Sequence, residues 1–94
     1  MSEEITLSES ELRMRIEELA LLLLYLAHWV EDEKLIPGGI HRAWKTVPFD
    51  ALDALTDKGY LVRVKRPSAS KSVVLTDEGL ARARELEKKY LSKF

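Results

Sequence analysis

The stretch "LTDKGYLVRVKRPSASKSVVLTDEG", residues 55–79, decides the fold. It begins and ends with the same phrase, Leu-Thr-Asp-x-Gly, and apolar residues alternate with other residues just after the first phrase. Alternation with a period of two is typical of β-strands, so we expect a two-stranded hairpin between the phrases. The first phrase follows a run with helical spacing and the second follows a strand. They are therefore expected to close one helix and to open another.

The helices that flank the hairpin can be bounded from the same two phrases. Gly59 is expected to end the first helix, because glycine readily adopts the left-handed conformation that follows many helices. Thr76 is expected to cap the second helix, with Asp77 and Glu78 in the first turn, where the helix dipole favours negative charge. Apolar residues at helical spacing predict two buried stripes: Phe49, Leu52 and Leu55 before the hairpin, and Leu80, Ala83, Leu86, Tyr90 and Phe94 after it.

The register of the hairpin follows from the length of its loop. A loop over residues 67–70 would place Val62 opposite Leu75 and Val64 opposite Val73. This pairing puts apolar residues together on one face, as a half-buried hairpin requires. The intervening basic residues of the first strand would then point away from the core.

The amino-terminal helix is expected to begin at Ser8, which has the capping-box spacing to Glu11, and to run until the Pro37-Gly38-Gly39 turn. Its segment Leu19–Val30 is apolar around nearly the whole circumference, whereas a surface helix has one apolar stripe. A second copy of the chain is therefore the expected cover, which predicts a homodimer. The expected interface residues are Leu21, Leu22, Leu24, Tyr25, Tyr90 and Phe94.

The segment Ile40–Lys45 is expected to form a short helix, and Pro48 suits the first turn of the next one. The predicted order is helix, short helix, helix, β-hairpin, C-terminal helix. This order describes an α+β chain that is mostly helical, and 94 residues correspond to a single domain spanning 1–94.

The segment "FDALDALTDKGYLVRVKRPSASKSVVLTDEGLARARELEKKY", residues 49–90, resembles the second half of MarR-type winged-helix regulators. The resemblance implies a helix-turn-helix fold with a recognition helix, a basic β-hairpin wing and a dimerising C-terminal helix. The words "RAWK" and "FDALDAL", followed by "KGYL" and "KSVVLTDEGL", also resemble a small bacterial family of unknown function built on this module. That second resemblance implies no activity.

The first functional expectation follows from the resemblance: the protein is a nucleic-acid-binding module of the transcription-regulator type. Five basic residues and no acidic residue lie between Lys58 and Val74, so the wing could contact phosphates. The residues expected to do so are Arg63, Lys65, Arg66, Ser68, Ser70 and Lys71. The alternative is that these charges only keep a solvated sheet edge from associating.

The expected recognition helix argues against groove reading, because its outward residues include Asp50, Asp53 and Asp57. Carboxylates cannot supply the phosphate contacts on which DNA binding depends. The second functional expectation is therefore a protein-interaction or assembly module that keeps the winged-helix scaffold without binding DNA. DNA, another protein and a second copy of the chain are the expected partners.

Catalysis and cofactor binding find little support. The chain has no cysteine and no glycine-rich phosphate loop, so we expect no enzyme activity, no cofactor and no catalytic residue. His28 and Asp32 are four residues apart, but metal sites need about three convergent ligands, and nothing fixes His41 near them. We therefore predict no metal site. Trp29 and Trp44 are interpreted as core aromatics, with a small-molecule pocket as the alternative.

The location of the protein is inferred from what the sequence lacks. The start "MSEEITLSESEL" is acidic and does not resemble a signal peptide. The richest apolar run, Leu19–Val30, is shorter than the roughly 20 residues of a membrane-spanning helix. We therefore expect a cytoplasmic protein with no membrane contact.

Overall fold

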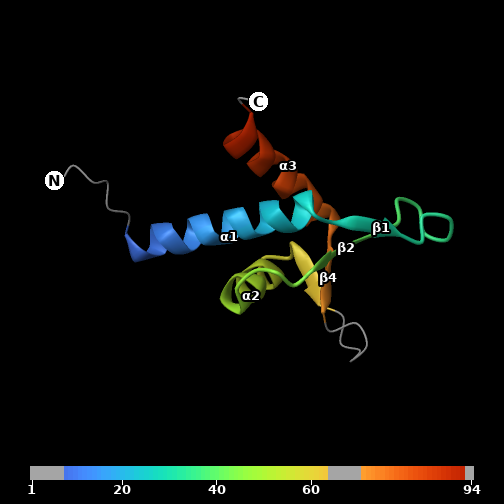
Figure 1. The fold of residues 1–94 in the computed structure, drawn as a ribbon, viewed down its shortest axis with the longest axis horizontal. Coiled ribbons are helices and arrows are strands. Elements are labelled where there is room, and N and C mark those ends of the chain that lie inside the picture. Colours follow the sequence, from blue (N-terminus) through green and yellow to red (C-terminus); the bar gives the residue numbers. More distant parts are fainter. Residues whose placement is uncertain (1–7, 64–70, 93–94) are drawn as a thin grey trace.

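The computed structural model describes residues 8–63 and 71–92 and has an α+β architecture, with about half of these residues helical (Figure 1). The mixed class predicted from the sequence is therefore confirmed. In chain order the elements are α1 (Glu9–Leu26), β1 (Trp29–Glu31), β2 (Ile40–Trp44), α2 (Phe49–Asp57), β3 (Leu61–Arg63), β4 (Ser72–Leu75) and α3 (Asp77–Leu91).

The four described strands form one antiparallel sheet in the order β1-β2-β4-β3. Strand β2 pairs with β4, which puts Ala43 opposite Val73, and both side chains are buried. The β1–β2 hairpin projects from the rest of the chain (Figure 1). At its tip, Gly39 has a φ of 72°, and a Cβ there would lie 2.4 Å from the Val30 side chain. Only glycine fits this turn.

The helix predicted to run from Ser8 to the Pro37 turn is wrong beyond Leu26. The Ser8–Glu11 capping box forms as predicted, but α1 ends at Leu26. The chain then enters β1, whose Trp29 pairs with Arg42 of β2. Bulky aromatic and β-branched residues favour strands where a partner is available, so the pairing with β2 overrides the continuous apolar pattern.

The short helix predicted over Ile40–Lys45 is also wrong, because Ile40–Trp44 is the strand β2. It lies between β1 and β4 and pairs with both. Five residues of this segment satisfy their backbone hydrogen-bonding groups through two neighbouring strands, which a single helical turn could not do. The four residues 45–48 that connect β2 to α2 contain no helix.

The hairpin β3–β4 exists as predicted, but its register is wrong by one residue. Leu61, not Val62, lies opposite Leu75, and Val62 lies opposite Val74. The turn after α2 sets this register, because the Tyr60 amide donates to the Leu55 carbonyl. Leu61 therefore faces the helices and is 2% exposed, whereas Val62 is 50% exposed.

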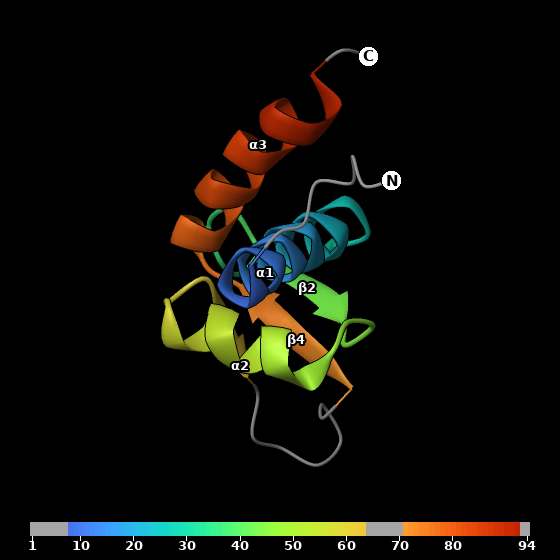
Figure 2. The same ribbon diagram turned by 90° about the vertical axis from the view of Figure 1, so that its left-hand side faces the viewer.

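The helices pack on one face of the sheet, with α1 between α2 and α3 (Figure 2). Leu21 and Leu24 of α1 are fully buried at the centre of this arrangement. The predicted apolar stripes of α2 and α3 are mostly buried, but Phe49 is 73% exposed and was wrongly placed in the core. The core contains Ala20, Leu21, Leu22, Leu24, Ala43, Ala51, Leu52, Leu55, Leu61, Val73, Leu75, Leu80, Ala83 and Leu86.

The two Leu-Thr-Asp-x-Gly phrases meet in space. Gly59 ends α2 with a φ of 82°, and its carbonyl accepts a 2.7 Å hydrogen bond from the Thr76 hydroxyl. The same hydroxyl accepts from the Gly79 amide at 2.9 Å and so caps α3, as predicted. Gly79 packs against the chain just after Gly59, because a Cβ there would lie 2.1 Å from the Tyr60 carbonyl oxygen. The repeated phrase thus fastens the end of α2 to the start of α3.

None of the helices in the described part of the chain has the length and apolar content needed to cross a membrane.

Candidate interaction surfaces

An apolar stripe runs along the outer side of α1, and we call it the α1 stripe. Its members are aliphatic, and each is 47–53% exposed. They are Leu12, Ile16, Leu19, Leu23 and Leu26. The steps between them are four, three, four and three residues, which is the spacing of a coiled-coil seam with a period of 3.5 residues. The helix therefore has a second apolar face in addition to the one that it buries.

Each residue of the α1 stripe stays about half exposed although α1 packs against both α2 and α3. Figure 2 looks along α1 and shows α2 below it and α3 above it. The stripe residue Ile16 borders a hollow that α2 also lines. Large contiguous apolar patches are uncommon on monomeric soluble proteins and commonly mark interaction sites. The 18 residues of α1 span about 27 Å, at about 1.5 Å per residue, and the stripe follows almost this whole length.

The residues predicted as a dimer interface lie elsewhere. Leu21, Leu22 and Leu24 are at most 5% exposed and belong to the core of the single chain. These leucines were expected at a dimer interface because their burial was expected to need a second copy. The single chain already buries them, so their burial needs no partner. Tyr25 and Tyr90 are partly buried and pack against the same core, while Phe94 lies outside the described residues.

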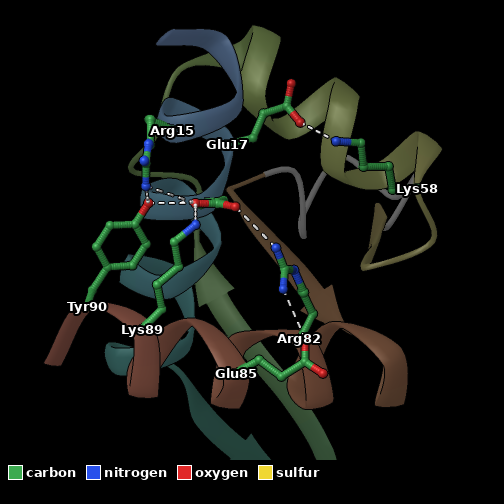
Figure 3. Close-up of polar contacts among 8 residues, drawn as sticks. Arg15, Glu17, Lys58, Arg82, Glu85, Lys89 and Tyr90 are labelled. Carbon is green, nitrogen blue, oxygen red and sulfur yellow. Dashed lines mark hydrogen bonds and ion pairs between the residues drawn. The ribbon is translucent and has the colours of Figure 1, made fainter. Parts of the chain in front are cut away.

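The carboxylate of Glu18 joins α1 to α3 through three hydrogen bonds. Their donors Arg82, Lys89 and Tyr90 are labelled in Figure 3. The carboxylate's Oε1 accepts from the Tyr90 hydroxyl at 2.5 Å and from Lys89 Nζ at 2.9 Å, and its Oε2 accepts from Arg82 at 3.1 Å. Arg15 donates to the Tyr90 hydroxyl from the other side. Glu18 is only 8% exposed, so this buried charge is fully paired, as buried charges must be.

Partial burial alone would raise the pKa of Glu18, but the hydrogen bonds from Tyr90 and Lys89 and the charge of Arg82 outweigh it and hold the pKa below its ordinary value. The carboxylate therefore stays ionised. Three side chains of α3 donate to this one carboxylate of α1. We interpret the Glu18 cluster as the tie that fixes α3 against α1.

In α2, the helix expected to read a DNA groove, and at its end, two charged residues form ion pairs with neighbouring elements. Arg63 of β3 donates to Asp53 of α2. Lys58 at the end of α2 reaches Glu17 of α1 at 2.6 Å (Figure 3). Two of the five basic residues assigned to the hairpin region thus face carboxylates of the same chain.

The predicted wing is described only at its two ends. Arg63 ends β3 and Lys71 precedes β4. Lys65, Arg66, Ser68 and Ser70 lie outside the described residues.

The two tryptophans lie together on the outer face of the sheet, and the prediction that both are core residues is wrong. Their ring centroids are 4.9 Å apart, and Trp44 is 56% exposed. The Trp29 indole donates to Glu31 at 2.7 Å, and Arg42 donates to the other oxygen of that carboxylate at 2.8 Å. The hydrogen bond from Trp29 and, in addition, Arg42 lower the pKa of Glu31 although partial burial opposes them.

The histidines His28 and His41 are neighbours, although nothing in the sequence indicated that they would lie close together. His28 Nε2 lies 3.0 Å from His41 Nδ1, and the outer ring nitrogens face the carbonyls of Tyr25 and Gly38. The two rings therefore fasten the end of α1 to β2. No three potential metal-ligand side chains gather anywhere in residues 8–63 and 71–92.

Together, these features define a small α+β domain with helices on one face of an antiparallel sheet and a half-exposed apolar stripe on its first helix. The chain belongs to the family described as domain of unknown function (DUF6429), which matches residues 13–93. No curated protein and no solved structure matches the chain significantly.

Proposed function

We propose that the protein is a non-enzymatic assembly module that pairs with a second copy of itself through the α1 stripe. The observation that carries the proposal is the 3.5-residue spacing of five half-exposed aliphatic side chains. This period keeps a seam of side chains facing one partner helix, whereas a solvated helix has no reason to maintain it.

A second copy is the occupant that the stripe fits best. Its own stripe supplies an identical seam of the same length, and most soluble oligomers are built from identical, self-complementary patches. Ile16 and Leu23 alternate with Leu12, Leu19 and Leu26, so that large aliphatic side chains meet at every level of the seam.

The charges beside the stripe favour an antiparallel pair. Arg13 and Arg15 lie near the start of α1. In a parallel pair, these arginines and their copies would gather at the same end of the pair, and like charges repel. In an antiparallel pair centred on Leu19, they would lie near residues 23–25 of the partner, which carry no charge.

Replacement of Leu19 and Leu23 by glutamate tests this function. Both side chains are half exposed in the single chain, so the double variant is expected to fold and to remain monomeric. Val62→Glu is the matched control, because Val62 is 50% exposed on the other side of the molecule from the helices. Size-exclusion chromatography with light scattering should show dimers of the wild type and of the control, and only monomers of the double variant. Equal association of all three proteins would contradict the proposal.

We further infer that the scaffold is a shortened winged helix. Strand β2 is followed by α2, and the hairpin β3–β4 then returns so that β4 pairs with β2. This connectivity supports the inference. The scaffold is called shortened because α2 is the single helix between β2 and β3, whereas a helix-turn-helix has two helices. An experimental structure in which β4 lay at the edge of the sheet would contradict it.

Binding of duplex DNA through the hairpin is a second candidate function, and it is favoured by the composition of residues 58–74, with five basic and no acidic residues. A wing that neutralises several phosphates must give binding that weakens steeply with salt. Titration with generic duplex DNA at low salt tests it, alongside a variant with Arg63, Lys65, Arg66 and Lys71 replaced by alanine. Absence of binding at low salt, or unchanged binding by the variant, would contradict this candidate.

A further inference from the structure

A hollow of about 490 Å³ lies between the end of β2, the start of α2 and the start of β4. It is lined by Trp44, Lys45, Phe49 and Lys71. None of these side chains belongs to the α1 stripe. Its volume is in the range of pockets that hold small organic ligands, which is roughly 300–1,000 Å³.

The aromatic side chains of this hollow are unusually exposed. Phe49 is 73% exposed and Trp44 is 56% exposed. Burial of either side chain in the core would be more favourable than its exposure to water, because burial of an aromatic ring removes a large apolar area from solvent. The Trp29 ring lies against Trp44, with the ring centroids 4.9 Å apart and the ring planes inclined at 42°. This contact restricts the orientations open to the Trp44 ring.

The charge of the hollow is positive. The backbone amide of Lys45 donates to the Lys71 carbonyl at 2.9 Å, so the two lysines lie side by side just beyond the paired ends of β2 and β4. Neither lysine forms an ion pair with a carboxylate within the described residues. Asp50, which follows Phe49 in the chain, lines a different hollow beside α1. The two ammonium groups are therefore available to an anion.

We propose that this hollow binds a nucleotide unit, with the base stacked on Trp44 or Phe49 and the phosphate between Lys45 and Lys71. Aromatic platforms beside basic side chains are the recurrent means of holding unpaired bases, because every base has a stacking face and every phosphate a negative charge. The unit can come from a free nucleotide or from a single strand of nucleic acid. The site differs from a duplex-binding wing, because the stacking faces of a duplex are already occupied.

The fluorescence of Trp44 provides a direct test. Trp29 and Trp44 are the two tryptophans of the chain, so a Trp29→Phe background leaves Trp44 as the sole indole. Stacking of a base is expected to quench its emission. Adenosine monophosphate and a short oligothymidine strand are titrated separately at low salt. Quenching by both probes indicates a free-nucleotide site, and quenching by the oligonucleotide alone indicates a single strand. Quenching by neither overturns the proposal.

Variants in the same background separate stacking from charge. Phe49→Ala is expected to weaken binding roughly tenfold, the usual scale for the loss of one stacked base. Lys45→Gln with Lys71→Gln is expected to weaken it and to flatten its salt dependence. Lys34→Gln, which removes one positive charge from the exposed β1–β2 turn, is the control for an effect of net charge alone. Binding that is unaffected by the Phe49 and double-lysine variants, or reduced equally by Lys34→Gln, would overturn the assignment to this hollow.

Discussion

The Tyr90 hydroxyl donates a 2.5 Å hydrogen bond to Oε1 of Glu18, and this contact joins α3 to α1 across 72 residues of the chain. Replacement of Glu18 by alanine leaves three donors of α3 without their acceptor. We expect the free energy of unfolding to fall by about 1–3 kcal/mol, the usual effect of leaving charged and polar partners unmatched. Urea denaturation followed by circular dichroism measures this change.

The neighbouring Glu85 provides the control for that experiment. Glu85 also pairs with Arg82, but its side chain is 68% exposed. Exposed ion pairs contribute little, so Glu85→Gln should change stability by less than about 0.5 kcal/mol. Equal effects of the Glu18 and Glu85 variants would show that the Glu18 cluster does not fasten α3.

The free energy of unfolding should depend on pH through the carboxylate of Glu18. The pKa of Glu18 is lower in the folded chain than its ordinary value near 4.5. The unfolded state therefore binds a proton more readily, and the contribution of Glu18 is complete above pH 4.5. It is lost as the pH falls through the lowered folded pKa. Measured from neutral pH downwards, the unfolding free energy of wild type should decline more steeply in this range than that of Glu18→Gln. Parallel curves would contradict the prediction.

The contact between the two Leu-Thr-Asp-x-Gly phrases predicts a strict requirement for glycine at position 79. In a helix interior alanine is normally more favourable than glycine by about 0.5–1 kcal/mol. Here a Cβ would lie 2.1 Å from the Tyr60 carbonyl, so Gly79→Ala should instead lower the unfolding free energy by more than about 2 kcal/mol. Thermal or urea unfolding checks the sign, and a stabilised variant would contradict the close packing.

The outcome of the predictions made from the two Leu-Thr-Asp-x-Gly phrases shows what local sequence can determine. The helix ends at Gly59 and Thr76 were predictable, because caps depend on the conformational freedom of glycine and on a hydroxyl at one position. The register between Leu61 and Leu75 was not, since the turn through Tyr60 sets it. The strand Ile40–Trp44 was missed for a related reason: it pairs with both β1 and β4, and β4 lies far away in the sequence.

The α1 stripe could have been found from the sequence. Its spacing is visible between Leu12 and Leu26, but the inner residues Leu21, Leu22 and Leu24 conceal it within an almost unbroken apolar run. Sequence alone does not say which of two apolar faces the rest of the chain covers. The structure separates them, and it therefore moves the expected interface from the buried leucines to the half-exposed ones. The hollow at Trp44 was unpredictable, because Phe49 was expected to be buried.

The orientation of the proposed pair can be measured by cross-linking, since the chain has no cysteine of its own. In an antiparallel pair centred on Leu19, residue 12 of one copy lies beside residue 26 of the other. A mixture of Leu12→Cys and Leu26→Cys chains should then form the mixed disulfide dimer under mild oxidation, while each variant alone should not. Disulfide formation by each single variant, without the mixed product, would indicate a parallel pair.

The most direct test of the proposed function is the molar mass of the full wild-type chain in solution, measured by sedimentation equilibrium over a wide range of concentrations. The α1 stripe predicts that the mass rises with concentration from 10.8 kDa towards twice that value. It also predicts that Leu19→Glu with Leu23→Glu keeps the mass at 10.8 kDa throughout. A wild-type chain that stays at the single-chain mass at every concentration would contradict the account.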